Sequence, residues 1–225
     1  MLRLASDKER LFYEKELYPL QDEVLRTIKT EKLYLSGGTA LSRFHYNHRY
    51  SDDLDFFFDG YNFKQEEFEI TVREILNDLS EKFEVESVVK SDLFIRAFVK
   101  NKETVLKLEF IFENYKCVGN RERSGSVLID SKENLAVNKL TTIYDRRTVK
   151  DYVDLFFLLK EFDLQSVAKW AEHKIVPLDY EDVLTAFSSF KLEGTALLIK
   201  EICENEFNSF VKELLKRMVE YAHNR

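Results

Sequence analysis

A double glycine followed by two closely spaced aspartates at the start of an apolar strand constrains this chain most. Gly37 and Gly38 allow a backbone turn that bulkier residues would block, so amide groups can point at an anion near a helix N-terminus. Asp53 and Asp55 stand at strand positions i and i+2, which places both carboxylates on one face. A phosphate-binding turn beside a metal-binding pair predicts the handling of a nucleoside triphosphate with magnesium.

The composition of the 225-residue chain is typical of a soluble globular protein with one large domain or two small ones, because 44% of residues are hydrophobic and 33% charged. No apolar run approaches the roughly 18 residues that a membrane span needs. The N-terminus is charged from its first residues and has no apolar signal core. We therefore expect a cytoplasmic protein with no membrane partner.

Cysteine, histidine and charge carry less information. Cys117 and Cys203 belong to no Cys-x-x-Cys pair, which makes a disulfide scaffold or a zinc site a poor interpretation. His45 and His48 are expected as surface or supporting residues. The net charge is −7, yet residues 121–150 hold seven Lys or Arg and four Asp or Glu. Such a basic segment can bind phosphate locally, and a solvated helix face explains it equally well.

Hydrophobic periodicity predicts an α+β fold in which a mixed sheet with flanking helices is followed by a helical half. The expected strands cover residues 32–36, 54–58, 85–90, 93–100, 103–112 and 127–129. The expected helices cover residues 6–30, 39–46, 64–83, 131–144, 149–161, 164–173, 180–188, 195–205 and 206–222, with Ser131 as an N-cap. The polar stretch 118–125 predicts a boundary between a domain of residues 1–122 and a mainly helical domain of residues 123–225.

A third carboxylate is expected from the strand over 103–112. Leu106, Leu108 and Phe110 alternate there with Lys107 and Glu109, which face the opposite side. Asp53, Asp55 and Glu109 then fit the ligands of a two-magnesium site, where the cations activate an attacking hydroxyl and stabilise the leaving pyrophosphate. Taken singly, the glycine pair is common in turns, the Asp-x-Asp pair occurs in solvated turns, and Glu109 is typical of an exposed strand.

Two motifs in order resemble a known family. The first is Gly37-Gly38-Thr39-x-Leu41 followed by Arg49-x-Ser51-x-Asp53-Leu54-Asp55-Phe56. The second is Lys139-x6-Arg146-Arg147-x2-Lys150-Asp151-x2-Asp154-Leu155. Together they resemble the AbiEii/AbiGii toxin family of the nucleotidyltransferase superfamily with DNA polymerase beta-like palms. The resemblance runs from residue 33 to about 160, and the last sixty or so residues carry no matching motif.

This resemblance implies roles for individual residues. The amides of Gly38 and Thr39, with Gly37 forming the turn, would hold the terminal phosphates, and Arg49 and Ser51 would brace the metal strand or touch phosphate. Lys139 would reach the triphosphate as a mobile point charge. Helical spacing places Lys139, Thr142 and Arg146 on one face, which makes Arg146 a further phosphate ligand.

The carboxylates that follow Lys139 have two interpretations. Asp151 or Asp154 would orient Lys139 or act as a base, and Asp151 is the one expected to be catalytic. The alternative is a salt-bridged helix whose core side is formed by Tyr152, Leu155, Phe156 and Leu159.

The resemblance also implies a function. We expect a magnesium-dependent nucleotidyltransferase, with manganese as the other candidate cation, that acts as the toxin of a type IV-like toxin–antitoxin or phage abortive-infection pair with a cognate antitoxin. It would transfer NMP from NTP to an acceptor, with the tRNA 3′ end as the expected target. The sequence shows no RNA-binding module such as an aromatic-bearing strand, so contact by shape and charge is expected. The alternatives are transfer to protein or to a small hydroxylated molecule, and a catalytically silent nucleotide-binding module.

Overall fold

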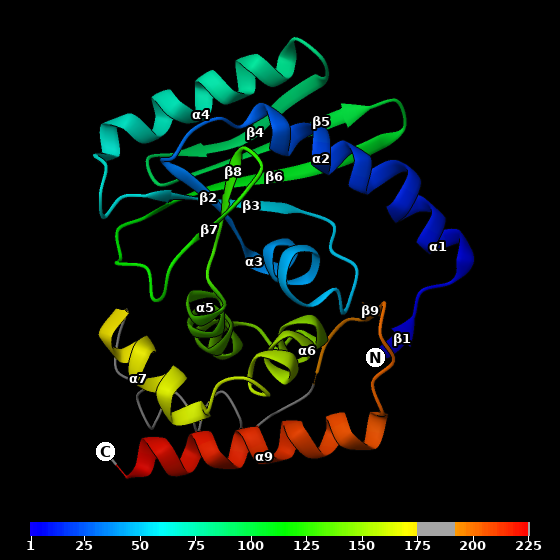
Figure 1. Ribbon diagram of the computed structural model, residues 1–225, viewed down its shortest axis with the longest axis vertical. Coiled ribbons are helices and arrows are strands. Elements are labelled where there is room, and N and C mark those ends of the chain that lie inside the picture. Colours follow the sequence, from blue (N-terminus) through cyan, green and yellow to red (C-terminus); the bar gives the residue numbers. More distant parts are fainter. Residues whose placement is uncertain (175–191, 225) are drawn as a thin grey trace.

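A seven-stranded mixed sheet forms one half of the molecule in this computed structural model, which describes residues 1–174 and 192–224 (Figure 1). The strand order is β4-β5-β6-β3-β2-β8-β7. Strand β3 pairs in parallel with β6, and β2 with β8, while the other pairs are antiparallel. The strands are β2 (Leu33–Ser36), β3 (Leu54–Asp59), β4 (Glu84–Ser91), β5 (Phe94–Asn101), β6 (Thr104–Glu113), β7 (Glu122–Ser124) and β8 (Val127–Ile129).

One face of this sheet packs against helix α4 (Gln65–Ser80) and forms the core of this half (Figure 1). The rings of Phe58 and Phe68 make an edge contact there, with centroids 5.6 Å apart. Phe56 and Phe110 stack on the same face at 5.4 Å. Since side chains alternate along a strand, Asp55 and Glu109 must point to the other face. The apolar side of the sheet thus determines which side carries the carboxylates.

Helices form the other half of the molecule. They are α5 (Lys132–Asp145), α6 (Val149–Leu158), α7 (Leu164–Lys174) and α9 (Glu204–His223), and they lie below the sheet in Figure 1. Most side chains of α6 are buried, because it packs against α5, α9 and the strand β9 (Ala196–Leu198). Such an all-round apolar helix belongs in an interior. Two aspartates on this helix are therefore held in the core.

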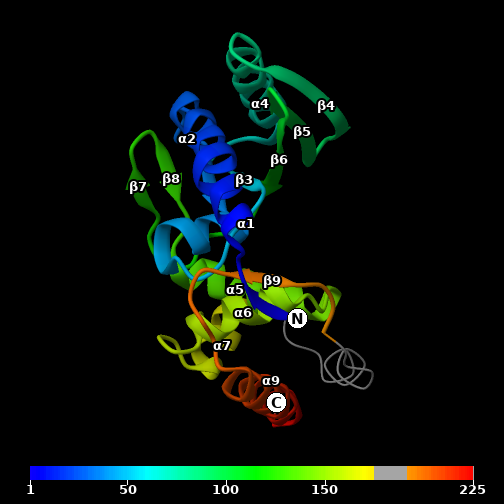
Figure 2. The ribbon, with the colours of Figure 1, turned by 90° about the vertical axis from the view of Figure 1, so that its right-hand side faces the viewer.

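The remaining elements are a second, small sheet and two helical stretches that contain π-helical turns. A second, two-stranded sheet pairs β1 (Leu2–Leu4) in parallel with β9 (Figure 2). The following helical stretch consists of α1 (Asp7–Phe12), the π-helix η1 (Tyr13–Leu17) and α2 (Tyr18–Thr27). The glycine pair opens α3 (Gly37–Thr39), which continues as the π-helix η2 (Ala40–Tyr46).

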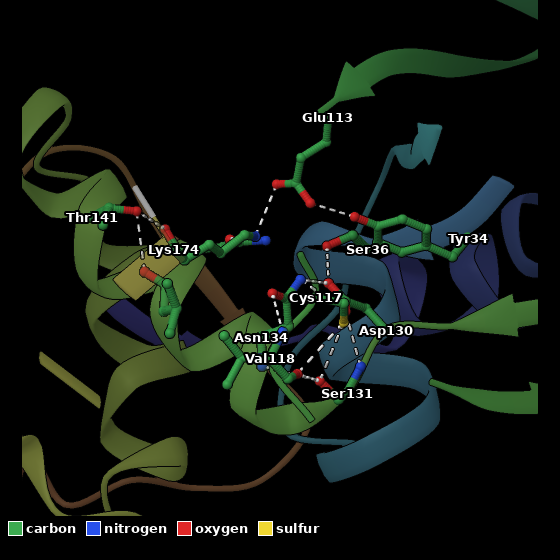
Figure 3. A network of polar contacts seen from close by, with 12 residues as sticks. Tyr34, Ser36, Glu113, Cys117, Val118, Asp130, Ser131, Asn134, Thr141 and Lys174 are labelled. Carbon is green, nitrogen blue, oxygen red and sulfur yellow. Dashed lines mark hydrogen bonds and ion pairs between the residues drawn. The ribbon is translucent and has the colours of Figure 1, made fainter. Parts of the chain in front are cut away.

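A buried polar network fixes α5 and α7 against the sheet (Figure 3). At the end of β2, the Ser36 hydroxyl donates to Asp130 Oδ2 at 2.6 Å, and both Asp130 oxygens accept from the Asn134 amide on α5. The Lys174 ammonium on α7 lies 2.9 Å from Glu113 Oε1 on β6. Because buried polar groups need their partners, this network sets one position for α5 relative to the glycine turn.

Most predicted elements are confirmed, including the α+β class, the alternation along β6 and the Ser131 N-cap, which accepts from the amide of Asn134. The predicted helix over 195–205 is wrong. That segment forms β9, because β1 and the stretch around Arg49 supply hydrogen-bond partners from far away in the sequence. The short apolar run fits helix or strand equally well by periodicity alone. The predicted helix over 180–188 lies outside the described residues.

The predicted domain boundary between residues 122 and 123 falls inside strand β7. Strand β8, just beyond it, pairs with β2, so the sheet extends past the boundary. One hydrophobic cluster also includes residues of both halves, from Tyr13 to Ala222. Among the described residues, no helix is long and apolar enough to span a bilayer.

Candidate active site

A cavity of about 500 Å³ lies between the sheet face opposite α4 and the helical half. All but one of the sequence-predicted site residues line it. These are Gly37, Gly38, Arg49, Ser51, Asp53, Asp55, Glu109, Lys139, Arg146 and Asp151. Their elements are far apart in the sequence, so their convergence depends on the tertiary fold.

The glycine turn passes so close to the acidic strand that side chains are excluded. Gly37 has φ +68°, and a Cβ built on it would lie 2.2 Å from Asp55 Oδ2. A Cβ on Gly38 would lie 2.5 Å from Arg49 Nη2. The hydroxyl of Ser36, the N-cap, donates to Asp130 and makes no hydrogen bond to the first turn. The first amides of this helical run therefore lack a side-chain cap and suit an anion in the cavity.

Thr39, the remaining predicted residue, does not line the cavity. It is fully buried, and its hydroxyl contacts Ser51 Oγ at 2.9 Å and the Asp53 carbonyl. Thr39 thereby joins the glycine turn to the segment that leads into β3. Its side chain fits a positioning role better than a phosphate contact.

Three carboxylates gather at one edge of the cavity, and we call Asp53, Asp55 and Glu109 the acidic cluster. Asp55 and Glu109 are direct neighbours in the β3–β6 register. The Lys107 ammonium lies 2.9 Å from Asp53 Oδ2 and 3.3 Å from Glu109 Oε1, so one cation bridges two of the three acids. Arg96 also binds Glu109, at 2.7 Å.

Asp55 has the most perturbed carboxyl of the cluster. Burial, followed by repulsion from Glu109 and Asp53, raises the pKa of Asp55 to about 6. Burial also acts on Glu109, yet Arg96 and Lys107 outweigh it and lower the pKa of Glu109. The negative charge at Asp55 is thus incompletely compensated by the protein, which favours an additional cation at this place.

The residues of the acidic cluster fit a magnesium ion by chemistry, because Mg²⁺ prefers carboxylate and phosphate oxygens. In this structure the Lys107 ammonium lies between Asp53 and Glu109 and contacts both carboxylates. In the described part of the chain, no three His, Cys, Asp or Glu side chains already converge as a metal cage. Glu109 is instead paired with Arg96 and Lys107.

Lys139 projects from α5 into a pair of carboxylates on α6. Its ammonium lies 2.7 Å from Asp151 Oδ1 and 2.7 Å from Asp154 Oδ2. Asp151 also accepts from the Thr148 hydroxyl at 2.5 Å. Although burial opposes it, Lys139 and these hydrogen bonds lower the pKa of Asp151. A carboxylate held in this way orients Lys139 better than it would accept a proton.

Asp154 has more partners than the sequence indicated. It is fully buried and binds the Arg49 guanidinium through both oxygens, each at 2.7 Å, as well as Lys139. Burial alone would raise its pKa, but Arg49 and Lys139 hold the pKa of Asp154 well below its ordinary value. All three guanidinium nitrogens of Arg49 are therefore engaged within the protein, by Asp154 and by the Tyr50 carbonyl, which favours a supporting role over a phosphate contact.

His48 takes the second of its two expected roles, that of a supporting residue. It is fully buried, and its Nε2 lies 2.8 Å from Asp154 Oδ1. Burial lowers the pKa of His48, so the ring is neutral and donates from Nε2 to the carboxylate. Its position directly before Arg49 in the first motif was the only available signal.

Arg146 and Lys150 provide exposed cationic groups at the cavity. The Arg146 side chain is 60% exposed while it contacts Asp151, and Lys150 is 42% exposed and pairs with Asp52 at 3.0 Å. Part of the predicted basic segment thus faces the cavity. Other members pair elsewhere, as Arg123 does with Glu31.

The mixed sheet, the glycine turn and the acidic strand beside a buried lysine define the class of nucleotidyltransferases. Residues 20–219 match the family model described as "Nucleotidyl transferase AbiEii toxin, Type IV TA system". Because this match covers most of the chain, the protein belongs to the AbiEii family of nucleotidyltransferase toxins and is an enzyme of that class.

Individual relatives are distant. An uncharacterized protein, aq_aa25, from Aquifex aeolicus (strain VF5) is 27% identical over 202 residues, which cover 85% of this chain and 88% of the relative. The crystal structure of JHP933 from Helicobacter pylori has a TM-score of 0.60 at 19% identity and covers 99% of this chain and 96% of its own. MenT4, a nucleotidyltransferase toxin from Mycobacterium tuberculosis H37Rv, has a TM-score of 0.58 at 18% identity. The match covers 90% of this chain and 82% of the MenT4 chain. The two structures show the shared fold.

Replacing Asp55 by Asn should stabilise the metal-free protein at neutral pH. The folded-state pKa is raised from 3.8 to about 6, so the stability of the wild-type protein declines as the pH rises between these values. The Asp55→Asn variant carries no charge at this position, so its stability advantage over the wild-type protein should grow across that window to about 3 kcal/mol and then stay constant. Urea unfolding in the presence of a chelator at pH 4.5, 6 and 8 measures this difference in the free energy of unfolding. Asp78→Asn, an exposed change on α4, is the control, and equal stabilities at every pH would contradict the expectation.

Removal of the Asp154 carboxylate should destabilise the whole fold. Asp154→Ala leaves the charges of Arg49 and Lys139 buried without their shared anion, which is expected to cost about 3–5 kcal/mol. Chemical denaturation monitored by circular dichroism gives the change, with the exposed Asp92→Ala as a matched control. A loss below about 1 kcal/mol would show that the two cations find other partners.

Proposed function

We propose that this protein transfers a nucleoside monophosphate from an NTP to the 3′ end of tRNA, with magnesium as cofactor, as the toxin of a type IV-like toxin–antitoxin or abortive-infection pair. One observation carries the proposal. A single cavity joins the glycine turn, the acidic cluster and the basic side chains of α5 and α6. Anion-binding amides, oxygen ligands and cations are the parts that this transfer requires.

The chemistry assigns a task to each part. The amides of Gly38 and Thr39, in the turn formed by Gly37, and the side chains of Lys139 and Arg146 bind the triphosphate. Asp53, Asp55 and Glu109 would hold magnesium, which when bound neutralises charge on the phosphate oxygens. The 3′-hydroxyl oxygen of the acceptor forms a bond to the α-phosphorus as the bond to pyrophosphate breaks. Its proton passes to a carboxylate of the acidic cluster.

Membership of the toxin family supports the biological part of the proposal. A toxin of this kind implies an NTP substrate and a cognate antitoxin. Exposed Arg146 and Lys150 at the cavity support a polyanionic acceptor, because such contacts attract phosphates without reading bases.

Removal of one acidic ligand tests the function. Asp53→Asn should lower nucleotide transfer by at least about a hundredfold, since charge stabilisation in the transition state is lost. The assay incubates the protein with each α-labelled NTP, magnesium, tRNA, lysate protein and an aminoglycoside, and follows where the label appears. The second readout is bacterial growth after expression of the wild-type protein or of a variant is induced. Asp78→Asn, on the helix that covers the opposite face of the sheet, should retain full activity in both assays.

The position of the label decides among the acceptors. Label in tRNA supports the proposal. Label in protein or in the aminoglycoside would contradict the tRNA acceptor and identify that molecule as the acceptor instead. Full activity of Asp53→Asn would exclude the metal role of the acidic cluster. If NTP and magnesium raise the melting temperature while no acceptor is labelled, the protein is a silent nucleotide-binding module.

A further inference from the structure

The sheet face that carries the acidic cluster continues beyond the cavity onto strand β5. Ile95, Ala97 and Val99 of β5 are buried on the α4 side. Phe94, Arg96 and Phe98 alternate with them and therefore lie on the cavity side, where all three are half-buried. We call Phe94, Arg96 and Phe98 the β5 platform.

The register of β5 and β6 places this platform directly beside the cavity. Phe98 is opposite Lys107, Arg96 is opposite Glu109, and Phe94 is opposite Ile111. Each of these three β6 residues lines the cavity. In Figure 1, β5 lies between β4 and β6 on the side of the sheet away from β8. The β5 platform is thus a lateral extension of the active-site floor.

The two rings lie outside the hydrophobic core of the described part of the molecule. Neither Phe94 nor Phe98 belongs to the hydrophobic core or packs against it among the described residues. The neighbouring strands also expose apolar side chains, with Val89 at 39% and Val105 at 51%. Apolar surface gathered on one face in this way indicates an interaction site.

We propose that the β5 platform binds the unpaired 3′ end of the nucleic-acid acceptor by stacking bases on Phe94 and Phe98. This proposal rests on the proposed function, because the strand end must bring its hydroxyl to the acidic cluster. Aromatic rings on an exposed sheet next to cationic side chains are a general solution for single strands. Phe94 and Phe98 lie four residues apart, about 13 Å along the strand, so each ring contacts a different base.

Charge on the platform favours a nucleic acid over an apolar protein segment or a second copy of this chain. The Arg96 guanidinium lies 5.3 Å from the centroid of the Phe94 ring, and Lys107 stands across from Phe98. Both cations lie at the junction of platform and cavity, with Glu109 and Asp53 as their present partners. A backbone phosphate next to a stacked base suits this pattern of ring and cation.

Binding of a short RNA tests the proposal without turnover. The probe is a single-stranded RNA with a 3′-hydroxyl and 2-aminopurine at its last or next-to-last position. The wild-type protein should bind it and quench the 2-aminopurine fluorescence through stacking. Phe94→Ala with Phe98→Ala should weaken binding at least about tenfold and abolish the quenching. Tyr61→Ala, which removes a 56% exposed aromatic ring in the turn after β3, should change neither measurement.

Conservative variants separate stacking from packing. Phe94→Trp with Phe98→Trp should preserve affinity and quenching. Phe94→Leu with Phe98→Leu keeps apolar bulk but no aromatic ring, so this variant should lose both. The melting temperature and its shift with NTP and magnesium verify that each variant folds and retains its triphosphate site. A blunt RNA duplex should bind alike to the wild-type protein and the double-Ala variant.

The outcomes distinguish the two proposals. Unchanged RNA affinity and quenching in the double-Ala variant would overturn the platform, and nucleotide transfer to tRNA would still stand. A wild-type protein that binds NTP but not the RNA would overturn the platform and the nucleic-acid acceptor together. A dimer that dissociates in the double-Ala variant, measured by analytical ultracentrifugation, would assign the surface to a second copy and also overturn the proposal.

Discussion

The ion cluster around Asp154 is the interaction on which the active site depends. This one carboxylate binds Arg49, which belongs to the glycine and aspartate motif, and Lys139, which belongs to the second motif. The two motifs are about a hundred residues apart in sequence, and the anion joins the sheet half to the helical half. Because all three groups are buried, none can be removed without leaving an uncompensated charge. The cluster therefore holds Arg49 and Lys139, two residues that line the cavity, in place.

Two kinds of polar group surround this cluster. Some have their hydrogen-bonding atoms engaged within the protein, and others remain available to a ligand in the cavity. Thr39 and Arg49 have their donors engaged within the protein, and Asp151 is held by Lys139 and Thr148. The glycines line the cavity at a helix start that has no side-chain cap, and Arg146 is largely exposed. Strong intramolecular contacts reduce the freedom of the first group, which is the physical meaning of preorganisation.

The sequence predicted the site better than it predicted the connections around it. Strand alternation placed Asp55 and Glu109 correctly on one face, because the apolar partners Phe56 and Phe110 leave no other choice. The pairing of β1 with β9 could not be predicted, since it joins residues at opposite ends of the chain and has no local signal. The position of Lys107 between two acids was also beyond sequence reasoning. It depends on side-chain geometry across neighbouring strands.

The two faces of the sheet also determine which side chains of β5 are buried. Read alone, the run from Phe94 to Val99 is nearly continuous apolar sequence, typical of a strand buried on both sides. In the fold, only the α4 face is covered by the core, and the Phe residues lie on the face that carries the acids. An apolar residue is buried or available depending on what packs over it, and periodicity alone does not contain that information. The place of Phe94 and Phe98 beside the cavity thus follows only from the register of β5 with β6.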